Sequence, residues 1–276
     1  MRRPSPWAWG LAMGVAACTP EAPRAVTAPV TAPVTAPVTA PSSERPAAPG
    51  AERFEPAVRE MTFAGLSARV LVTRPVRVGE RVPMVVGLHG YGDSARGFAG
   101  VFDGLPLKAR VIVLDGPEPW GGGGEGRAWF AIGQAEQRPE VFDAAVRRVA
   151  AAMREARVRF ETCGAPVVTG FSQGAMVSFG LAAEGASVVR GAVPVAGRLP
   201  SGVALLPGRG AGVTVVALHG TADPRIAYTD GAAAVARLLG AGYRASLVSF
   251  EGVGHSLPPA VLAALHTQLE ALGRCP

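Results

Sequence analysis

The feature that most constrains the fold is an alternation of short apolar runs with longer helix-like stretches, which extends from Arg53 onward. The runs have the length of strands buried on both faces, and the longer stretches have the apolar spacing of amphipathic helices. This alternation predicts an α/β fold, in which helices cover both faces of a mostly parallel, twisted sheet. In such a sheet, catalytic residues gather in the loops at the carboxyl ends of the strands.

The strands and main helices can be placed from these patterns. The first two strands, 58–63 and 68–73, are expected to form an antiparallel hairpin across the segment 64–67. The other expected strands are 82–88, 110–114, 166–169, 191–195, 213–218 and 245–250, and the expected helices are 139–159, 172–184, 229–240 and 258–272. The short connection 196–212 leaves no room for a large lid domain, so an open cleft is expected.

Residues 1–17 have the proportions of a bacterial lipoprotein signal peptide. Two arginines precede an apolar run that is too short to span a bilayer, and the run ends in Val-Ala-Ala directly before Cys18. This order resembles the site at which a lipoprotein is cleaved and its cysteine acylated. We therefore expect lipidation of Cys18, and an exported bacterial lipoprotein anchored to a membrane at its periplasmic or cell-surface face. The alternative is an ordinary signal peptide in which Cys18 is incidental.

A proline-rich linker, 18–52, follows the signal peptide. It repeats Thr-Ala-Pro-Val between Thr27 and Pro41. A proline at every fourth position disfavours helices and central strands and favours extended, polyproline-like backbone. Such a spacer reaches at most about 100 Å at roughly 3.1 Å per residue. Residues 53–276 then form the folded domain, which the linker holds away from the membrane.

The composition excludes two broad classes of protein. Hydrophobic residues make up 49% of the chain and charged residues 17%, and this balance excludes a wholly disordered protein. The formal net charge is +6, but the arginines are scattered rather than clustered. No nucleic-acid partner is therefore expected.

A candidate nucleophile lies in the sequence Gly-Phe-Ser-Gln-Gly at 170–174, which matches the pattern G-x-S-x-G. The pattern follows a strand-like run and precedes a helical one, as a sharp strand–turn–helix elbow requires. The flanking glycines relieve crowding, so that the hydroxyl of Ser172 can project from the turn. The alternative is a glycine-rich turn with a bystander serine.

A serine hydroxyl needs a base, and His255 is the best of the four histidines. On an elbow of this kind, the acid and then the base follow the serine along the chain. His255 directly follows the strand 245–250. His266 lies within the last expected helix, where a surface position is expected, and His89 and His219 precede any acid that fits the order.

The acid that orients this imidazole is predicted to be Asp223. It follows the strand 213–218 and is held in a turn by Pro224. Asp230 opens a helical pattern and suits a helix cap better, and Glu251 immediately ends a strand.

Two backbone N–H groups are predicted to form an oxyanion hole. Gln173 supplies one of them at the beginning of a helix, and Tyr91 supplies the other from the glycine-rich loop after the strand 82–88. The same loop is also compatible with a tight turn into a helix capped by Asp93 or Ser94.

With these residues identified, the region 81–257 resembles the phospholipase/carboxylesterase family of α/β-hydrolases, which includes the acyl-protein thioesterases. The matching segments are 88–93 (Leu-His-Gly-Tyr-Gly-Asp), 127–130 (Arg-Ala-Trp-Phe), 170–175 (Gly-Phe-Ser-Gln-Gly-Ala), 219–224 (His-Gly-Thr-Ala-Asp-Pro) and 254–256 (Gly-His-Ser). The resemblance implies an α/β-hydrolase fold and a Ser–Asp–His esterase without a cofactor. It also agrees with Tyr91 and Gln173 as the oxyanion hole. Ala131 stands where relatives usually carry Asp, and Tyr91 replaces an aliphatic residue; these departures bear on acyl-chain preference.

Three aromatic residues are candidates for the walls of an acyl pocket. Trp120, Trp129 and Phe130 follow the strand 110–114 in one connection. The alternative is that at least one of them packs beneath this connection. Phe171, which precedes the nucleophile, is expected to pack within the elbow rather than contact substrate.

Cys163 and Cys275 remain after export and are predicted to form a disulfide. Cys163 precedes the strand that leads to Ser172, and Cys275 follows the last helix, which runs antiparallel to the strands. Both cysteines should then lie at the sheet edge away from the active site, and an oxidising compartment permits the bond. Neither cysteine resembles a metal ligand, and no metal is expected.

The expected function is hydrolysis of short- to medium-chain acyl esters, which are small or lipid-like molecules, by a serine carboxylesterase. One alternative is a secreted feruloyl or polyester (polyhydroxyalkanoate-type) esterase, and another is a serine peptidase on the same fold. A non-catalytic surface lipoprotein is the third. The oligomeric state has no signature in the sequence.

Overall fold

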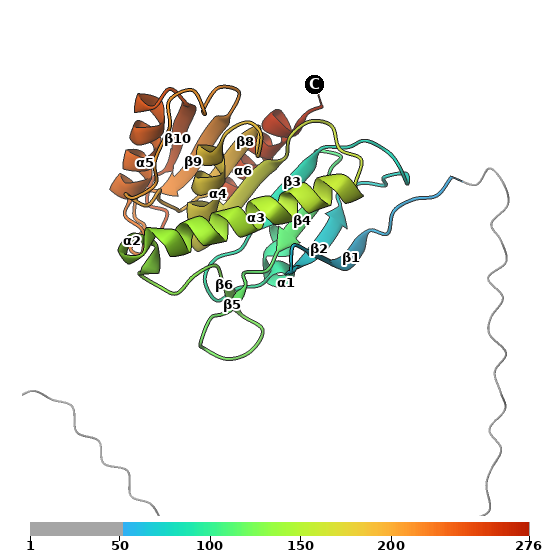
Figure 1. Ribbon diagram of the computed structural model, residues 1–276, viewed down its shortest axis with the longest axis horizontal. Helices are drawn as coiled ribbons and strands as arrows, with labels where there is room; N and C mark the ends of the chain where they lie inside the picture. Colours follow the sequence, from blue (N-terminus) through green and yellow to red (C-terminus); the bar gives the residue numbers. More distant parts are fainter. Residues whose placement is uncertain (1–51, 276) are drawn as a thin grey trace, which may run out of the picture. The chain divides into compact units, whose positions relative to one another are not determined.

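One sheet of eight strands forms the centre of the computed structural model, which describes residues 52–275. The strands are β1 (Val58–Phe63), β2 (Leu66–Val72), β3 (Met84–Leu88), β4 (Arg110–Leu114), β7 (Val167–Phe171), β8 (Gly191–Val195), β9 (Thr214–Gly220) and β10 (Arg244–Phe250). Their order across the sheet is β1-β2-β4-β3-β7-β8-β9-β10 (Figure 1). β2 is antiparallel to β1 and β4, and all other neighbours are parallel. The predicted fold class is therefore confirmed.

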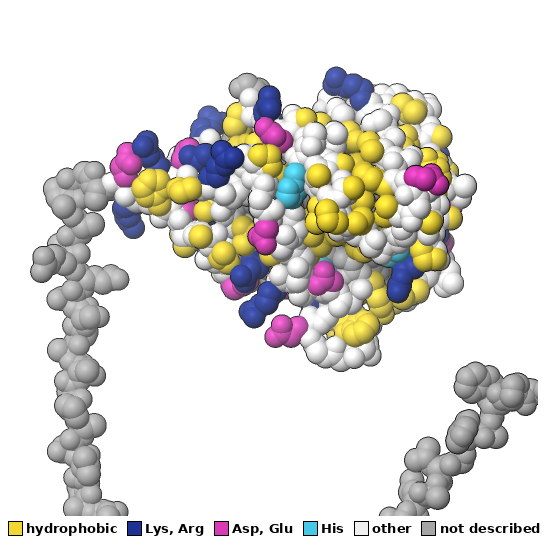
Figure 2. All heavy atoms as spheres, turned by 180° about the vertical axis from the view of Figure 1, so that it is seen from behind, with side chains coloured by type: hydrophobic (Ala, Val, Ile, Leu, Met, Phe, Trp, Pro, Cys, Tyr) yellow, Lys and Arg dark blue, Asp and Glu magenta, His cyan; other side chains and the backbone are white. Residues whose placement is uncertain are grey.

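Helices cover both faces of this sheet. One face carries α3 (Pro139–Arg159), α4 (Gln173–Glu184) and α5 (Tyr228–Gly240), and the other carries α1 (Ala95–Phe98), the 3₁₀ helix η1 (Ala99–Phe102) and α6 (Pro259–Gly273). Figure 2 shows the molecule from behind, where apolar side chains gather over α6 and the edge strand β10. None of the helices within 52–275 is both long and apolar enough to cross a bilayer. The expected signal peptide (1–17), Cys18 and the linker up to residue 51 lie outside the described residues.

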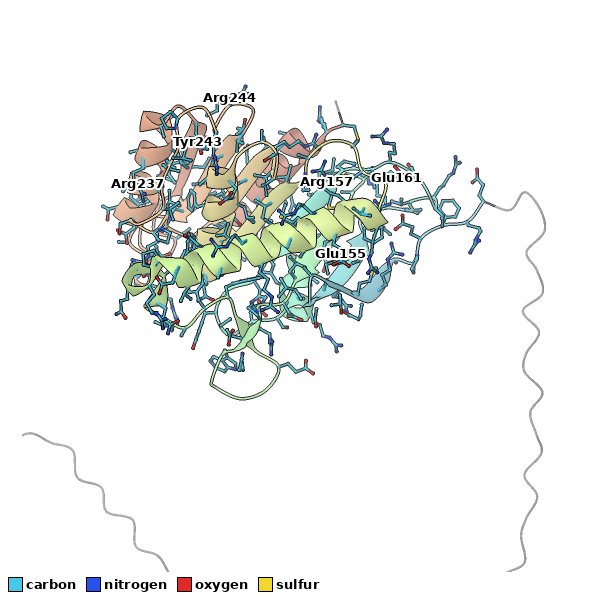
Figure 3. The ribbon with its side chains drawn as sticks, viewed as in Figure 1. Glu155, Arg157, Glu161, Arg237, Tyr243 and Arg244 are labelled. Atoms are coloured by element: carbon cyan, nitrogen blue, oxygen red, sulfur yellow. A yellow bond between two sulfur atoms is a disulfide. The ribbon has the colours of Figure 1, made fainter. Side chains whose placement is uncertain are left out.

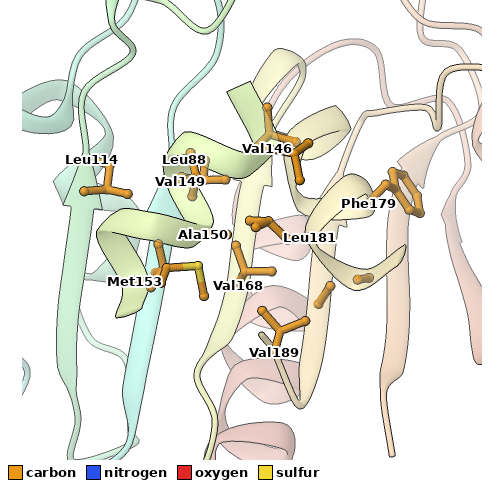
Figure 4. Close-up of a cluster of buried hydrophobic side chains, with 14 of the residues drawn as sticks. Leu88, Leu114, Val146, Val149, Ala150, Met153, Val168, Phe179, Leu181 and Val189 are labelled. Atoms are coloured by element: carbon orange, nitrogen blue, oxygen red, sulfur yellow. The ribbon is translucent and has the colours of Figure 1, made fainter. Parts of the chain in front are cut away.

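Alternating residues of the strands divide the hydrophobic core into two layers. Val168 faces the layer beneath α3 and α4, whereas its neighbour Val167 faces the layer beneath α6. Successive side chains of a strand point to opposite faces, so burial on both faces needs apolar residues at every position. Figure 4 shows part of the first layer, which includes Leu88 and Leu114 of the sheet and Val149 of α3.

The opening hairpin has a tighter turn than the sequence analysis predicts. β1 and β2 are joined by Ala64 and Gly65 alone, with φ angles of 48° and 76°. Two residues with positive φ are typical of a turn whose twist matches that of the strands. The N–H of Ala64 donates to Oε2 of Glu155 on α3 at 2.6 Å, so a tertiary contact supports the strained alanine. This contact has no local sequence signal.

Several short elements also differ from prediction. β3 begins at Met84 rather than at residue 82, because Pro83 has no N–H to donate to a neighbouring strand. α1 and η1 follow β3, and α2 (Gln134–Gln137) and the two-residue strands β5 (Glu118–Pro119) and β6 (Arg127–Ala128) lie between β4 and α3. Elements of this length are too short to show a hydrophobic period.

The connection between β8 and β9 is held down by one arginine. The guanidinium of Arg237, on α5, donates to the carbonyls of Leu199 and Pro200 at 3.0 Å, Ser201 at 3.2 Å and Val203 at 2.8 Å (Figure 3). The four bonds bind the middle of this connection to the side of the domain. Residues 199–203 are therefore held against α5, and the connection adds no lid domain to the sheet.

A disulfide joins Cys163 and Cys275, whose Cα atoms lie 5.5 Å apart. It links the segment before β7 to the end of α6, at the edge of the sheet where the parallel strands begin. Arg190 adds to this attachment, because its guanidinium donates to the carbonyls of Gly273 at 2.5 Å and Arg274 at 2.8 Å. A cation at the carboxyl end of a helix satisfies carbonyls that have no partner within the helix.

Replacing both cysteines by alanine is expected to lower the free energy of unfolding by about 2–5 kcal/mol, since the bond spans 112 residues and restricts the unfolded chain. Urea denaturation of the purified domain measures this change. Wild type treated with a reducing agent should move to the same midpoint. A double variant whose midpoint equals that of the oxidised wild type would contradict the prediction.

Candidate active site

Ser172 occupies a strained turn between β7 and α4. Its φ and ψ angles are 54° and −112°, which a non-glycine residue rarely adopts. The residue lies outside α4, although the sequence analysis includes it in the expected helix. The turn raises the hydroxyl above the carboxyl edge of the sheet, as predicted for a nucleophile elbow.

The two glycines that flank Ser172 are required by space. A Cβ atom on Gly174 would lie 2.1 Å from the carbonyl oxygen of Leu88, and one on Gly170 would lie 2.4 Å from the backbone of Gly174. The first turn of α4 therefore rests directly against the end of β3. The glycines of the motif permit this close approach, and any larger residue would displace the elbow.

Ser172, His255 and Asp223 lie in one hydrogen-bonded chain. The hydroxyl oxygen of Ser172 is 2.9 Å from Nε2 of His255, and Nδ1 of His255 is 2.7 Å from Oδ2 of Asp223. The Asp223 side chain is fully buried and that of His255 is 9% exposed. Ser172 follows β7, Asp223 follows β9 and His255 follows β10. The structure thus brings His255 together with two residues that lie 83 and 32 positions before it in the sequence.

The carboxylate of Asp223 is held by its own loop. Its Oδ1 accepts the backbone N–H groups of Arg225 at 2.8 Å and Ile226 at 3.0 Å. Burial alone would raise the pKa of this carboxyl group, but the hydrogen bonds from Ile226, His255 and Arg225 outweigh burial and lower the pKa below its ordinary value. The ionised form that can orient an imidazole is thereby favoured.

A second imidazole lies against the same carboxylate. Nε2 of His219 is 3.0 Å from the carbonyl oxygen of Ile226 and 3.5 Å from Oδ2 of Asp223, and the His219 side chain is 1% exposed. Gly231 of α5 leaves space for the other side of the ring, because a Cβ there would lie 2.4 Å from Nδ1. His219 therefore packs behind the acid and does not reach Ser172.

His89 has a structural role in the loop that carries Tyr91. Its Nδ1 donates to the carbonyl of Gly90 at 2.7 Å, and its Nε2 accepts the N–H of Gly116 at 2.9 Å. Burial lowers the pKa of this imidazole, so the neutral form is favoured. The helix-cap reading of this loop is confirmed, because Ser94 caps α1 by accepting the N–H of Gly97 at 3.2 Å.

The N–H groups of Tyr91 and Gln173 have no acceptor within residues 52–275. They come from the loop after β3 and from the first residue of α4, and β3 and β7 are neighbours in the sheet. Two unoccupied donors beside a serine hydroxyl are the arrangement that stabilises a developing oxyanion.

The side chain of Gln173 ties the elbow to a wall of the cleft, a role that the sequence analysis missed. Its Oε1 accepts the N–H of Trp129 at 2.8 Å, and its Nε2 donates to the carbonyl of Phe130 at 2.6 Å. This amide satisfies one donor and one acceptor of a loop more than 40 positions away in the sequence. No local pattern could have indicated it.

Ser172 and His255 open onto a cleft of about 620 Å³. The apolar residues that line it are Phe130, Ile132, Phe171, Met176 and Ile226, and the charged ones are Asp93, Glu136, Arg198 and Arg225. Phe130 is thus the one predicted aromatic residue that borders the cleft. Ile226 and Phe171 are close in sequence to Asp223 and Ser172, and this proximity was the signal that could have identified them.

The two tryptophans, which are predicted as walls of an acyl pocket, do not line this cleft. Trp129 is 2% exposed and packs beneath the loop, where its Nε1 donates to the carbonyl of His89 at 2.9 Å. Trp120 lies beside Tyr91, whose hydroxyl donates to the Trp120 carbonyl at 2.7 Å. Both tryptophans border a neighbouring cavity of about 640 Å³.

Two further expectations are corrected by the structure. Phe171 does not only pack within the elbow, because its ring borders the cleft and lies 4.8 Å from the ring of His255. His266 is not a free surface residue, because its Nε2 donates to the carbonyl of Val101 at 2.7 Å and so fastens α6 to η1. Within residues 52–275, no group of three or more His, Cys, Asp or Glu residues is arranged to hold a metal ion.

A sequence model of the phospholipase/carboxylesterase family matches residues 78–272, which is more than half of the chain. This chain belongs to the phospholipase/carboxylesterase family. The matched region begins before β3 and ends within α6, so it includes every strand and loop that carries a residue of the candidate site. The resemblance inferred from the five motifs is confirmed, and the chain is a serine ester hydrolase.

Solved structures of proteins with this fold are similar over most of the domain. Acyl-protein thioesterase 2 of Zea mays is 22% identical, with a TM-score of 0.60 over 75% of this chain and 99% of the maize chain. A carboxylesterase of Bacillus cereus is 17% identical, with a TM-score of 0.62 over 75% of this chain and 94% of the Bacillus chain. The Thermus thermophilus protein TT1662 is 23% identical, with a TM-score of 0.62 over 81% and 100% of the two chains. Among curated proteins, no significant match is found.

The lowered pKa of Asp223 predicts how the free energy of unfolding depends on pH. Because the folded state favours the carboxylate, its contribution is present above the ordinary pKa of 3.8 and is lost as the pH falls through the lowered value. The free energy of unfolding should therefore fall more steeply for wild type than for Asp223→Asn between about pH 5 and pH 3, where imidazoles are normally protonated. Urea titrations at several pH values measure both slopes.

The matched control is Asp103→Asn, which removes an exposed carboxylate without a hydrogen-bond donor among the described residues. Its slope should equal that of wild type. An Asp223→Asn slope that also equals wild type would contradict the prediction.

Proposed function

We propose that this chain is a serine carboxylesterase that hydrolyses short- to medium-chain acyl esters through Ser172, His255 and Asp223. One observation carries the proposal: His255 lies within hydrogen-bond distance of Ser172 on one side, at 2.9 Å, and of Asp223 on the other, at 2.7 Å. An imidazole in this position can take the hydroxyl proton while the carboxylate stabilises the charge that results. Family membership supports the same reaction class.

The first half of the reaction forms an acyl-enzyme. Oγ of Ser172 attacks the ester carbonyl carbon as its proton moves to Nε2 of His255. The carbonyl oxygen becomes negative and accepts the N–H groups of Tyr91 and Gln173. His255 then gives its proton to the alcohol oxygen, the bond between carbonyl carbon and alcohol oxygen breaks, and the alcohol leaves.

The second half uses water in place of the alcohol. His255 takes a proton from a water molecule while the water oxygen attacks the acyl-enzyme. The bond to Oγ breaks, the proton returns to Ser172, and the carboxylic acid leaves. Asp223 remains ionised throughout, because its other oxygen keeps two backbone donors.

The cleft supports acyl groups of short to medium length. A volume of about 620 Å³ holds a small ester with part of its chain, and aromatic and aliphatic side chains line the space beside Ser172. Tyr91 and Phe130 also border the neighbouring cavity of about 640 Å³, so the two spaces adjoin at these residues.

Replacing Ser172 by alanine is expected to reduce kcat on p-nitrophenyl butyrate by more than about 10³-fold, because it removes the hydroxyl that lies 2.9 Å from Nε2 of His255. The same variant should lose labelling by a fluorophosphonate probe. Spectrophotometric assay and gel fluorescence measure the two effects.

Ser246→Ala is the matched control, since Ser246 is exposed on β10 and borders neither cavity. It should retain the wild-type rate and labelling. Wild-type turnover by Ser172→Ala would refute the assignment, and greater activity on p-nitroanilides or feruloyl and polymeric esters than on simple acyl esters would refute the substrate class.

We further propose that the domain is exported and anchored through a lipid on Cys18. The signal-like residues 1–17 and the proline-rich linker support this location. The disulfide between Cys163 and Cys275 also supports it, because disulfides persist mainly in oxidising compartments.

Expression in a bacterium supplied with radiolabelled palmitate should label the full chain and should not label Cys18→Ala. The wild-type chain should sediment with membranes, and the variant should become soluble in the exported fraction. Labelling of the alanine variant, or unlabelled wild type, would contradict lipidation at this residue.

A further inference from the structure

Four charged side chains border the cleft, and three of them are engaged. Arg198 and Glu136 form an ion pair with 2.7 Å between the guanidinium and the carboxylate. Oδ1 of Asp93 accepts the N–H of Ser94 at 2.7 Å, and its carboxylate lies against the first turn of α1. Only the guanidinium of Arg225 has no carboxylate within 4.0 Å and no hydrogen-bond acceptor among residues 52–275. Among residues 52–275, the cleft thus presents one positive charge without a carboxylate partner, on Arg225, and one carboxylate without a cationic partner, on Asp93.

The backbone of Arg225 is fixed relative to the reacting groups. Its backbone N–H donates to Oδ1 of Asp223 at 2.8 Å, and Oδ2 of the same carboxylate is 2.7 Å from His255. One carboxylate therefore joins the arginine backbone to the imidazole. The guanidinium can move, but the backbone to which the side chain is attached is held beside His255 through Asp223.

The sheet order and the route of the proton indicate which part of the ester lies near Arg225. The oxyanion donors Tyr91 and Gln173 come from β3 and β7, whereas His255 and Arg225 follow β10 and β9 on the other side of Ser172 in the sheet order. His255 gives its proton to the leaving alcohol, so the alcohol part of the ester must lie beside it. Arg225 is thus closer to the alcohol part than to the oxyanion.

We propose that Arg225 makes the enzyme select esters whose alcohol part carries an anionic group, such as a carboxylate. A guanidinium binds a carboxylate through two parallel hydrogen bonds, and the exposed side chain of Arg225 is free to make them. The inference rests on the proposed esterase function and adds the chemical class of the alcohol. Arg225 would act as a specificity residue that contacts the substrate and takes no part in proton transfer.

Matched esters test this preference. The butyrate ester of 4-hydroxybenzoate carries a carboxylate on the alcohol part, and the butyrate ester of 4-hydroxybenzamide has the same shape without the charge. For each enzyme, the ratio of kcat/KM on the two esters gives the preference for the anion. Comparing these ratios between enzymes cancels the difference in chemical reactivity of the two leaving groups.

Arg225→Gln is expected to lower the ratio about 2- to 5-fold, because an exposed ion pair contributes this range. Arg225→Lys should lower it less, and Arg225→Glu should lower it further. The wild-type ratio should also fall as salt rises from about 20 to 500 mM, where exposed charges are screened. Arg244→Gln is the matched control, since Arg244 is exposed at the beginning of β10, the end of that strand away from His255 (Figure 3).

An equal ratio in wild type and Arg225→Gln would overturn the proposal, and so would an equal loss in Arg244→Gln, which would indicate a general surface field. In a second pair of esters, phenyl hemisuccinate carries a carboxylate on the acyl side and phenyl butyrate is its neutral counterpart. If Arg225→Gln lowers the preference for the anion only in this second pair, the assignment to the alcohol part is overturned.

A separate measurement distinguishes failure of this inference from failure of the esterase function. Hydrolysis of the neutral ester and its loss in Ser172→Ala test the esterase function alone. Binding of 4-hydroxybenzoate and 4-hydroxybenzamide to Ser172→Ala, followed by NMR titration, compares the charged and neutral groups without turnover. The acid should bind more tightly, and adding Arg225→Gln should remove the difference. Equal binding of acid and amide before that substitution would overturn the inference.

Discussion

The candidate site depends on the close approach of α4 to the end of β3. Only a residue without a side chain fits at position 174, where a Cβ would lie 2.1 Å from the carbonyl oxygen of Leu88. This contact sets the height of the strained turn at Ser172 above the sheet. It also brings the first N–H of α4 beside the loop that carries Tyr91, since β3 and β7 are adjacent. Ser172 and the N–H groups of Tyr91 and Gln173 are therefore positioned by one backbone contact.

The other half of the site is positioned differently, through hydrogen bonds within a loop. Asp223 takes two backbone donors from the residues that follow it, and His219 packs behind its carboxylate at 3.5 Å. The acid therefore keeps its place without help from the walls of the cleft. His255 extends from the edge strand β10 and connects this preorganised acid to the elbow. The two halves meet only at the imidazole.

Much of this arrangement could be predicted because its signals are local. Continuous apolar runs identified the parallel strands, and the order serine, acid, base identified Ser172, Asp223 and His255 as candidates. The remaining features depend on contacts between distant residues. Trp129 is buried because its indole bonds to the carbonyl of His89, and His219 approaches Asp223 because Gly231 of another element leaves space for its ring. Neither the burial of Trp129 nor the position of His219 can be predicted from the residues next to it in the sequence.

The four bonds from Arg237 to the connection between β8 and β9 have a consequence for the mouth of the cleft. They fasten residues 199–203 to α5, whereas Arg198, at the beginning of the same connection, borders the cleft and pairs with Glu136. The wall of the cleft at Arg198 therefore rests on backbone that is held in place from the next residue onward.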